Sequence, residues 1–219
     1  MSWINRLIIL TWQKLAPIVI IIYNFKLSIF FILIIIFCIL TRGIQGLNQV
    51  RLRKILTYSS INHIGWILRS IIYLESIWFI YFIIYIITSI NIVLILSKNN
   101  IFYLKQLFSN LNKNFFIKFI FILNFISLGG LPPLLGFFPK WLTIQELIFN
   151  KIYFLTLIIV IITLITLYFY IRIIFSTLIL NINEINIKLN SNINFIFIFF
   201  INLLSIIGLI FCKIVFINL

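Results

Sequence analysis

The fold is decided by the stretch SLGGLPPLLGFFPKW, residues 127–141, which lies inside an apolar run from 115 to 149. Pro132 and Pro133 remove two backbone donors and clash with the preceding turn, and the neighbouring glycines permit non-helical dihedral angles. In lipid, each backbone group freed by such a break would cost on the order of several kcal/mol. The break is tolerable only inside protein or beside a watery cavity, so we predict a broken helix within a membrane-embedded bundle.

The composition of the whole chain agrees with a membrane protein. Of its 219 residues, 64% are hydrophobic and only 9% are charged, whereas soluble domains carry about 25% charged residues. Lipid offers no hydrogen-bond partners, and the apolar runs lack the alternation of a barrel, so the spans must be helices. We predict an all-α, polytopic transmembrane helix bundle in a single domain, 1–219. It has about seven spans, near 3–23, 27–46, 55–74, 77–97, 115–149 (broken), 152–180 and 193–216.

The positive charges indicate how the bundle is oriented. The formal charge of +14 could suggest a nucleic-acid partner, but the basic residues fall at the ends of apolar runs and form no basic module. Three of them lie in the connection 47–54 and three in the polar connection 98–114, while the other side has little more than Lys26, Lys151 and Lys213. We therefore expect both connections on the positive-inside face, with 98–114 as a polar loop, and no nucleic-acid partner.

Lys14 is the first candidate for chemistry. It lies near the middle of the span 3–23, three residues before Pro17. A lysine at the centre of a bilayer costs about 2.5–3.5 kcal/mol on insertion scales. The alternative without a function is that the aliphatic part of its side chain stays buried while the amine extends to the membrane surface. The central position makes that reach awkward, so we favour a buried functional role.

Lys140 is the second candidate, because it follows the broken segment directly. An interfacial lysine beside Trp141 would be an ordinary aromatic-belt arrangement. The adjacent break favours function, since freed carbonyls and the end of a half-helix create a hydrated polar niche.

His63 is the third candidate, and it is the only histidine of the chain. Ser59, Asn62, His63 and Trp66 follow a spacing that puts them on one face of a helix, and such a polar face cannot look at lipid. Interhelical hydrogen bonds would explain this face. A proton relay would explain it equally well, because histidine both accepts and donates a proton near neutral pH.

The other charged residues inside apolar runs carry weaker signals. Arg69 and Glu75 could form a structural pair, and Arg172 either pairs with another charge or marks the interface of a long helix. We assign Glu146 no role. Cys38 and Cys212 lie in apolar stretches without metal-ligand spacing, and we expect buried thiols without a redox function.

The sequence also resembles a known family. The resemblance is carried by TWQKLAP (11–17), GLNQ (46–49) with LRKIL (52–56), YSS (58–60), GGLPP (129–133), GF (136–137) and PKW (139–141). In this order and spacing they resemble the chain 2 family of NADH–ubiquinone oxidoreductase, the antiporter-like membrane subunits of respiratory complex I. The resemblance covers residues 1 to about 180, and the last span agrees with it only in position and hydrophobicity.

The resemblance implies more than the residues alone do. It implies that Lys14 is the central lysine of a buried row of ionisable groups, that Lys140 is the lysine at the second broken helix, and that His63 bridges them as a proton relay. It further implies a place in the mitochondrial inner membrane, with 98–114 on the matrix side, among other membrane-arm subunits, lipid and protons. NADH and ubiquinone would be used by other subunits, with no cofactor or metal in this chain.

The chain departs from that family in one respect. The family usually has about four more spans before the one that holds Lys14, so we expect this sequence to be the C-terminal portion of the fold. Two functions are therefore weighed, a proton-translocating subunit and a structural membrane anchor without a complete proton path. A seven-span receptor is a third reading, but it explains neither the GGLPP break nor the basic second connection.

Overall fold

The computed structural model describes residues 2–24, 29–71, 75–111, 115–132 and 134–179. Over these ranges the regular structure is helical, apart from one isolated bridge between Arg51 and Tyr103. The elements are α1 (Trp3–Leu10), the 3₁₀ turn η1 (Trp12–Lys14), α2 (Leu15–Tyr23), α3 (Ile29–Gln45), α4 (Leu52–Ile71), α5 (Glu75–Lys98), α6 (Leu104–Leu111), α7 (Phe115–Gly129), α8 (Phe137–Phe149) and α9 (Tyr153–Ile179). Helices thus occupy the first six predicted spans, whereas the seventh, 193–216, lies outside the described residues together with Cys212.

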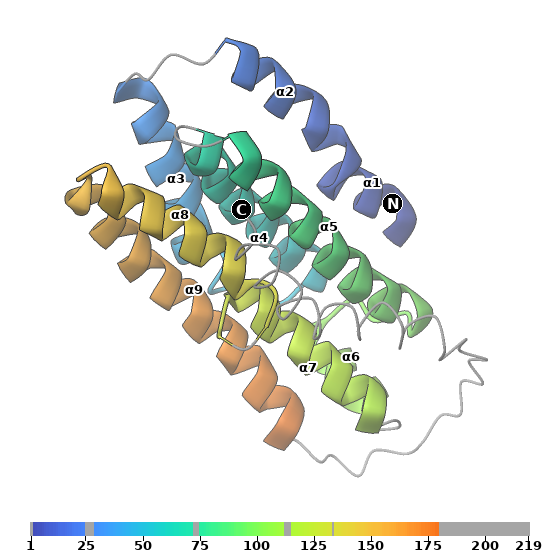
Figure 1. Cartoon of the computed structure of the whole chain (residues 1–219). Helices are drawn as coiled ribbons and strands as arrows, with labels where there is room; N and C mark the ends of the chain where they lie inside the picture. Colours follow the sequence, from blue (N-terminus) through green and yellow to red (C-terminus); the bar gives the residue numbers. More distant parts are fainter. Residues whose placement is uncertain (1, 25–28, 72–74, 112–114, 133, 180–219) are drawn as a thin grey trace.

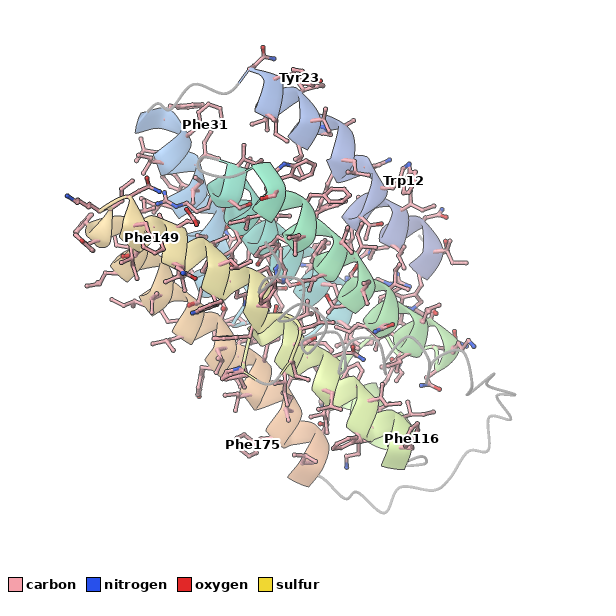
Figure 2. The ribbon with its side chains drawn as sticks, viewed as in Figure 1. Trp12, Tyr23, Phe31, Phe116, Phe149 and Phe175 are labelled. Atoms are coloured by element: carbon pink, nitrogen blue, oxygen red, sulfur yellow. The ribbon has the colours of Figure 1, made fainter. Side chains whose placement is uncertain are left out.

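Three of these segments are long and apolar enough to cross a membrane, namely Trp3–Tyr23, Ser76–Lys98 and Tyr153–Phe175. Their outward faces carry large apolar side chains. Figure 2 shows Trp12 and Tyr23 pointing away from the bundle at one edge, and both are exposed, as are Phe149 and Phe175 elsewhere. A water-facing surface would not tolerate such a coat, but lipid does. The chain is a multi-pass membrane protein.

The helices pack side by side around α5 (Figure 1). Helix α5 contacts α1, α4, α7 and α8, while α9 contacts α3, α7 and α8. Helices α1 and α2 form one outer edge of the bundle and α9 the opposite edge. The closest pairing, α3 with α4, depends on Gly65, since a Cβ there would come within 3.0 Å of Ile39.

The two basic connections meet at one end of the bundle. The Leu52 amide donates to the Phe102 carbonyl (3.0 Å) and the Leu104 amide donates to the Val50 carbonyl (3.2 Å), on either side of the bridge from Arg51 to Tyr103. This pairing agrees with the prediction that both connections lie on one face of the membrane. Which side of the membrane that face meets stays a prediction.

The connection 98–114 contains more structure than the predicted loop. Its middle forms α6, with Leu104, Leu107 and Leu111 at helical spacing. Leu107 and Leu111 are buried against the main core. The polar composition of the segment hid this apolar stripe, which is enough to fold an amphipathic helix onto the end of the bundle.

Candidate functional site

Lys140 caps the broken end of α7. The helix closes with a Schellman motif, in which Gly130 (φ 77°) donates its amide to the Ser127 carbonyl (3.0 Å) and Leu131 donates to the Ile126 carbonyl (3.4 Å). That motif leaves the last two carbonyls of the helix, those of Leu128 and Gly129, at the open end. The Lys140 Nζ donates to both, at 3.0 and 2.9 Å, and its side chain is buried. The break thus places Lys140 among freed carbonyls, and a functional role for this lysine stays a prediction.

The geometry of this break depends on its glycines. A Cβ on Gly130 would lie 2.7 Å from Lys140 Cδ and 2.8 Å from its Nζ, so the lysine lies directly on the glycine backbone. A Cβ on Gly136, the residue before α8, would collide with the Ser127 carbonyl. The two half-helices therefore pass each other at close range, and the amine is enclosed between them.

A second, unpredicted interruption lies in the first span, at Lys14. Pro17 cannot donate to the Gln13 carbonyl, and its ring would clash with that carbonyl in a continuous helix. The backbone tightens instead, and the Lys14 amide donates to the Thr11 carbonyl (3.3 Å). The Leu10 carbonyl, which Lys14 would bond in an unbroken helix, accepts from the Tyr85 hydroxyl instead (3.3 Å).

The Lys14 amine points into the bundle. It donates to the Ser60 carbonyl on α4 (3.2 Å) and lies 5.1 Å from the centre of the Tyr85 ring on α5, a cation–π contact. The residue as a whole is half-buried. These contacts disagree with the alternative in which the Lys14 amine extends to the lipid headgroups.

His63 belongs to α4 and contacts two tyrosines of α5. Its Nδ1 is 3.0 Å from the Tyr81 hydroxyl, and its ring centre is 4.9 Å from that of Tyr85. The predicted polar face of α4 is buried throughout, since Ser59, Asn62 and His63 are each at most 5% exposed. Nε2 of His63 is buried and has no protein partner among the described residues.

A small gap lies between His63 and the broken helix. It is lined by His63, Tyr81 and Tyr85 on one side and by Ser127, Leu128 and Pro139 on the other, with Thr88 between. It offers about 10 Å³ for the centre of a water-sized sphere, close to what one water molecule requires. Leu128 lines this gap, and its carbonyl accepts a hydrogen bond from Lys140. The gap therefore lies between His63 and a residue that Lys140 contacts.

Thus the three predicted residues are related to one another through shared neighbours. Lys14 contacts Tyr85, Tyr85 and His63 line the gap, and Leu128 connects the gap to Lys140. Over the described ranges, no group of three His, Cys, Asp or Glu side chains lies close enough to hold a metal ion.

The other charged residues lie elsewhere. Arg172 is exposed near the end of α9, which fits the interfacial reading, and Glu146 is half-buried on α8. Arg69 is buried on α4, while the side chain of Glu75 lies outside the described residues, so their predicted pairing stays a prediction. Cys38 is a half-buried free thiol.

Sequence reasoning missed several buried polar residues. Tyr81, Tyr85 and Thr88 recur at intervals of four and three along α5, a helical spacing that could have identified them. Arg42 belongs to α3 and is 2% exposed. Its guanidinium lies 4.7 Å from the Phe169 ring centre and donates to the Ile55 carbonyl (3.2 Å).

Comparisons with known proteins agree with this architecture. Residues 2–166 match the sequence family described as NADH:quinone oxidoreductase/Mrp antiporter, TM. The fold resembles a chain of respiratory complex I from Thermus thermophilus, with a TM-score of 0.62 at 22% identity over 67% of this chain and 35% of that one. It also resembles a chain of the Mrp complex from Dietzia, with a TM-score of 0.58 at 19% identity over 65% and 28% of the two chains.

The similar sequences are more specific. NADH-ubiquinone oxidoreductase chain 2 of Aedes aegypti is 46% identical over 184 residues, 84% of this chain and 54% of that protein. The protein of the same name from Anopheles albimanus is 47% identical over 129 residues, 58% of this chain and 75% of that sequence. The chain spans about half the length of the first of these relatives. It belongs to the NADH:quinone oxidoreductase/Mrp antiporter family of transmembrane subunits, and within it to the NADH-ubiquinone oxidoreductase chain 2 family.

Proposed function

We propose that this chain is a core membrane subunit of respiratory complex I and takes part in proton translocation coupled to electron transfer from NADH to ubiquinone. It would act in the mitochondrial inner membrane, beside other membrane-arm subunits, with 98–114 on the matrix side. NADH and ubiquinone would be handled by other subunits. The names of the similar proteins and the family membership support this assignment.

One observation carries the proposal. Lys14 and Lys140 each lie at an interruption of a membrane helix. Lys14 contacts Tyr85, whose ring lies beside that of His63. Lys140 donates to the carbonyl of Leu128, which lies across a small gap from His63. Buried ionisable groups in a membrane are costly and are kept where they serve ion or proton movement. Interrupted helices with polar groups at the break are typical of proteins that move ions.

In the mechanism that we infer, Lys14, His63 and Lys140 exchange protons. A water in the gap beside His63 would connect the imidazole Nε2 to the region of the Lys140 amine, and the Nδ1 would keep its hydrogen bond to Tyr81. Histidine suits this position because one nitrogen can accept a proton while the other donates. Two like charges in a low-dielectric interior repel each other, so the charge on one lysine influences the charge on the other.

The test is substitution of the two lysines in the assembled complex. Lys14→Met and Lys140→Met keep an unbranched side chain and remove the amine, and we expect each to lower proton translocation about a hundredfold, the low end of what a proton-transfer group contributes. NADH oxidation by an artificial acceptor should continue. Lys98→Met is the matched control, because Lys98 is exposed at the end of α5. Full translocation in both variants would contradict the proposal and favour a structural anchor.

A further inference from the structure

A groove opens at the end of the bundle that carries the two basic connections. One wall is the backbone stretch 47–50 together with Leu104, and the other is Phe169, Arg172 and Ile173 of α9. Its volume is about 450 Å³, within the range of about 300–1,000 Å³ typical of ligand pockets. The lining is mostly apolar, but Arg172 and Asn48 are exposed at it, so the groove is amphipathic.

An apolar stripe on α9 leads to this groove. Leu157, Ile161, Leu164 and Tyr168 are 51–63% exposed and recur every three or four residues, so they share one face of the helix. Arg172 follows Tyr168 by four residues and ends the stripe. This face of α9 therefore changes from apolar to cationic along the helix axis. An amphipathic ligand that lies parallel to α9 would match this change.

The charge around the groove has one sign. Further exposed cations lie at the same end of the bundle, namely Arg51, Lys54, Lys98 and Lys105. Glu75 at the start of α5 and Glu146 near the end of α8 belong to the opposite end, and they are the two acidic residues in the described ranges. An anionic group at Arg172 would thus meet attraction, and no carboxylate of the described residues lies at this end of the bundle to repel it.

We propose that the groove binds the headgroup of an anionic phospholipid, whose acyl chain lies along the exposed stripe of α9. The phosphate accepts hydrogen bonds from the Arg172 guanidinium, which matches phosphate geometry in a bidentate manner. Basic pockets at the ends of membrane helices suit anionic headgroups in this way. A soluble anion would bind Arg172 but would not cover the apolar stripe. An apolar helix packed on this face would cover the stripe but would provide no negative charge for Arg172. The site is independent of the proposed proton path.

The experiment uses the full-length protein in nanodiscs that contain phosphatidylcholine and a photoactivatable phosphatidylglycerol with the reactive group on its acyl chain. Mass spectrometry of the labelled peptides should place the label on α9 between Leu157 and Ile173. Excess unlabelled phosphatidylglycerol should compete with it, and phosphatidylcholine should not. Arg172→Gln should lower the labelling about fivefold, the effect expected for one cation at an anionic membrane surface.

Two further variants keep the result interpretable. Arg172→Lys keeps the charge and should restore most of the labelling, which separates loss of the charge from loss of the fold. Lys98→Gln removes a cation from the same end outside the groove and should change the labelling less than twofold, roughly, because its charge is screened over such a distance. Unchanged labelling in Arg172→Gln, equal competition by phosphatidylcholine, or no label on α9 would each overturn the proposal.

Discussion

At the scale of single residues, the position of Lys140 follows from a balance of two energies. Placing a lysine at the centre of a membrane costs about 2.5–3.5 kcal/mol. Each hydrogen bond to a charged group contributes about 1.5–3 kcal/mol, and Lys140 makes two, to the Leu128 and Gly129 carbonyls. The open end of α7 can therefore hold the amine in the interior, where a closed helix could not.

Gly130→Ala should disturb this arrangement more than Gly129→Ala. At Gly130, alanine meets a positive φ, which costs about 1–2 kcal/mol, and its Cβ displaces the Lys140 amine from the carbonyls. At Gly129 the nearest atom to a new Cβ is Tyr170 Cδ2 at 3.5 Å, an ordinary contact. We expect Gly130→Ala to lower proton translocation severalfold and Gly129→Ala to leave it nearly unchanged. Equal effects of the two variants would show that the contact with Lys140 is unimportant.

The sequence revealed the titratable residues of the site but not their partners. Lys14, His63 and Lys140 stand out because each is a polar residue within an apolar run. Tyrosine is common at membrane surfaces, so Tyr81 and Tyr85 looked unremarkable in an apolar helix. Only the packing of α5 against α4 and α1 gives them their role beside His63 and Leu10.

At the scale of helices, the two interruptions are built on the same device. Pro17 is the third residue of α2 and Pro139 the third residue of α8. In the first turn of a helix the amide has no intrahelical acceptor, so proline loses nothing there and still prevents continuation from the preceding helix. The break at 130–136 was predictable from its glycines and paired prolines. The break at Lys14 was not predicted, because its only signal in the sequence is the single proline, Pro17.

Pro17→Ala should therefore make the helix of the first span continuous and lower proton translocation. The new amide can bond the Gln13 carbonyl, and the Leu10 carbonyl would return to the Lys14 amide, which leaves the Tyr85 hydroxyl without its partner. We expect the apparent melting temperature to stay the same or to rise, because the new amide gains a hydrogen bond to the Gln13 carbonyl. Proton translocation should fall severalfold in the same sample.

Val19→Ala is the control for this change, since Val19 is exposed on the same helix. It should leave translocation unaltered. If Pro17→Ala translocates as well as the unaltered protein, the break at Lys14 has no functional part.

A pair of asparagines joins α5 to α7 beside the gap. The Asn91 Nδ2 donates to Asn124 Oδ1 (3.3 Å), and Asn124 in turn donates to the Ile120 carbonyl (3.0 Å). Asn91→Leu and Asn124→Leu should each destabilise the bundle, and the double variant should lose less than the sum of both. We expect a coupling energy between about 0.6 and 1.7 kcal/mol, as for hydrogen bonds between membrane helices, measured by a double-mutant cycle of unfolding. Strict additivity would mean that the pair contributes no specific interaction.

At the scale of the whole molecule, the apolar periodicity and the basic connections predicted the bundle and the common end of 47–54 and 98–114. They could not predict which helices touch, because an apolar face fits any neighbour. Helix α6 was not predicted because its segment is rich in polar residues. The burial of Arg42 was not predicted because a basic residue at the end of an apolar run is usually interfacial. Their burial depends on α9, which lies far away in the sequence.

The orientation can be tested with single cysteines after Cys38 and Cys212 have been replaced by alanine. Lys54→Cys lies at the basic end of the bundle and Lys151→Cys at the other end, and both side chains are exposed. A membrane-impermeant maleimide should label Lys54→Cys only from the positive-inside face and Lys151→Cys only from the opposite face. Labelling of both from one side would disprove the topology.

The central claim is that protons pass between Lys14 and Lys140 by way of His63. The most direct measurement is the number of protons translocated for each NADH oxidised by the assembled complex that carries His63→Gln, with Ser59→Ala on the same buried face as control. Glutamine can keep a hydrogen bond to Tyr81 but cannot carry a proton near neutral pH. The account predicts a clear fall in this ratio for His63→Gln and no change for Ser59→Ala. An unaltered ratio in His63→Gln would contradict it.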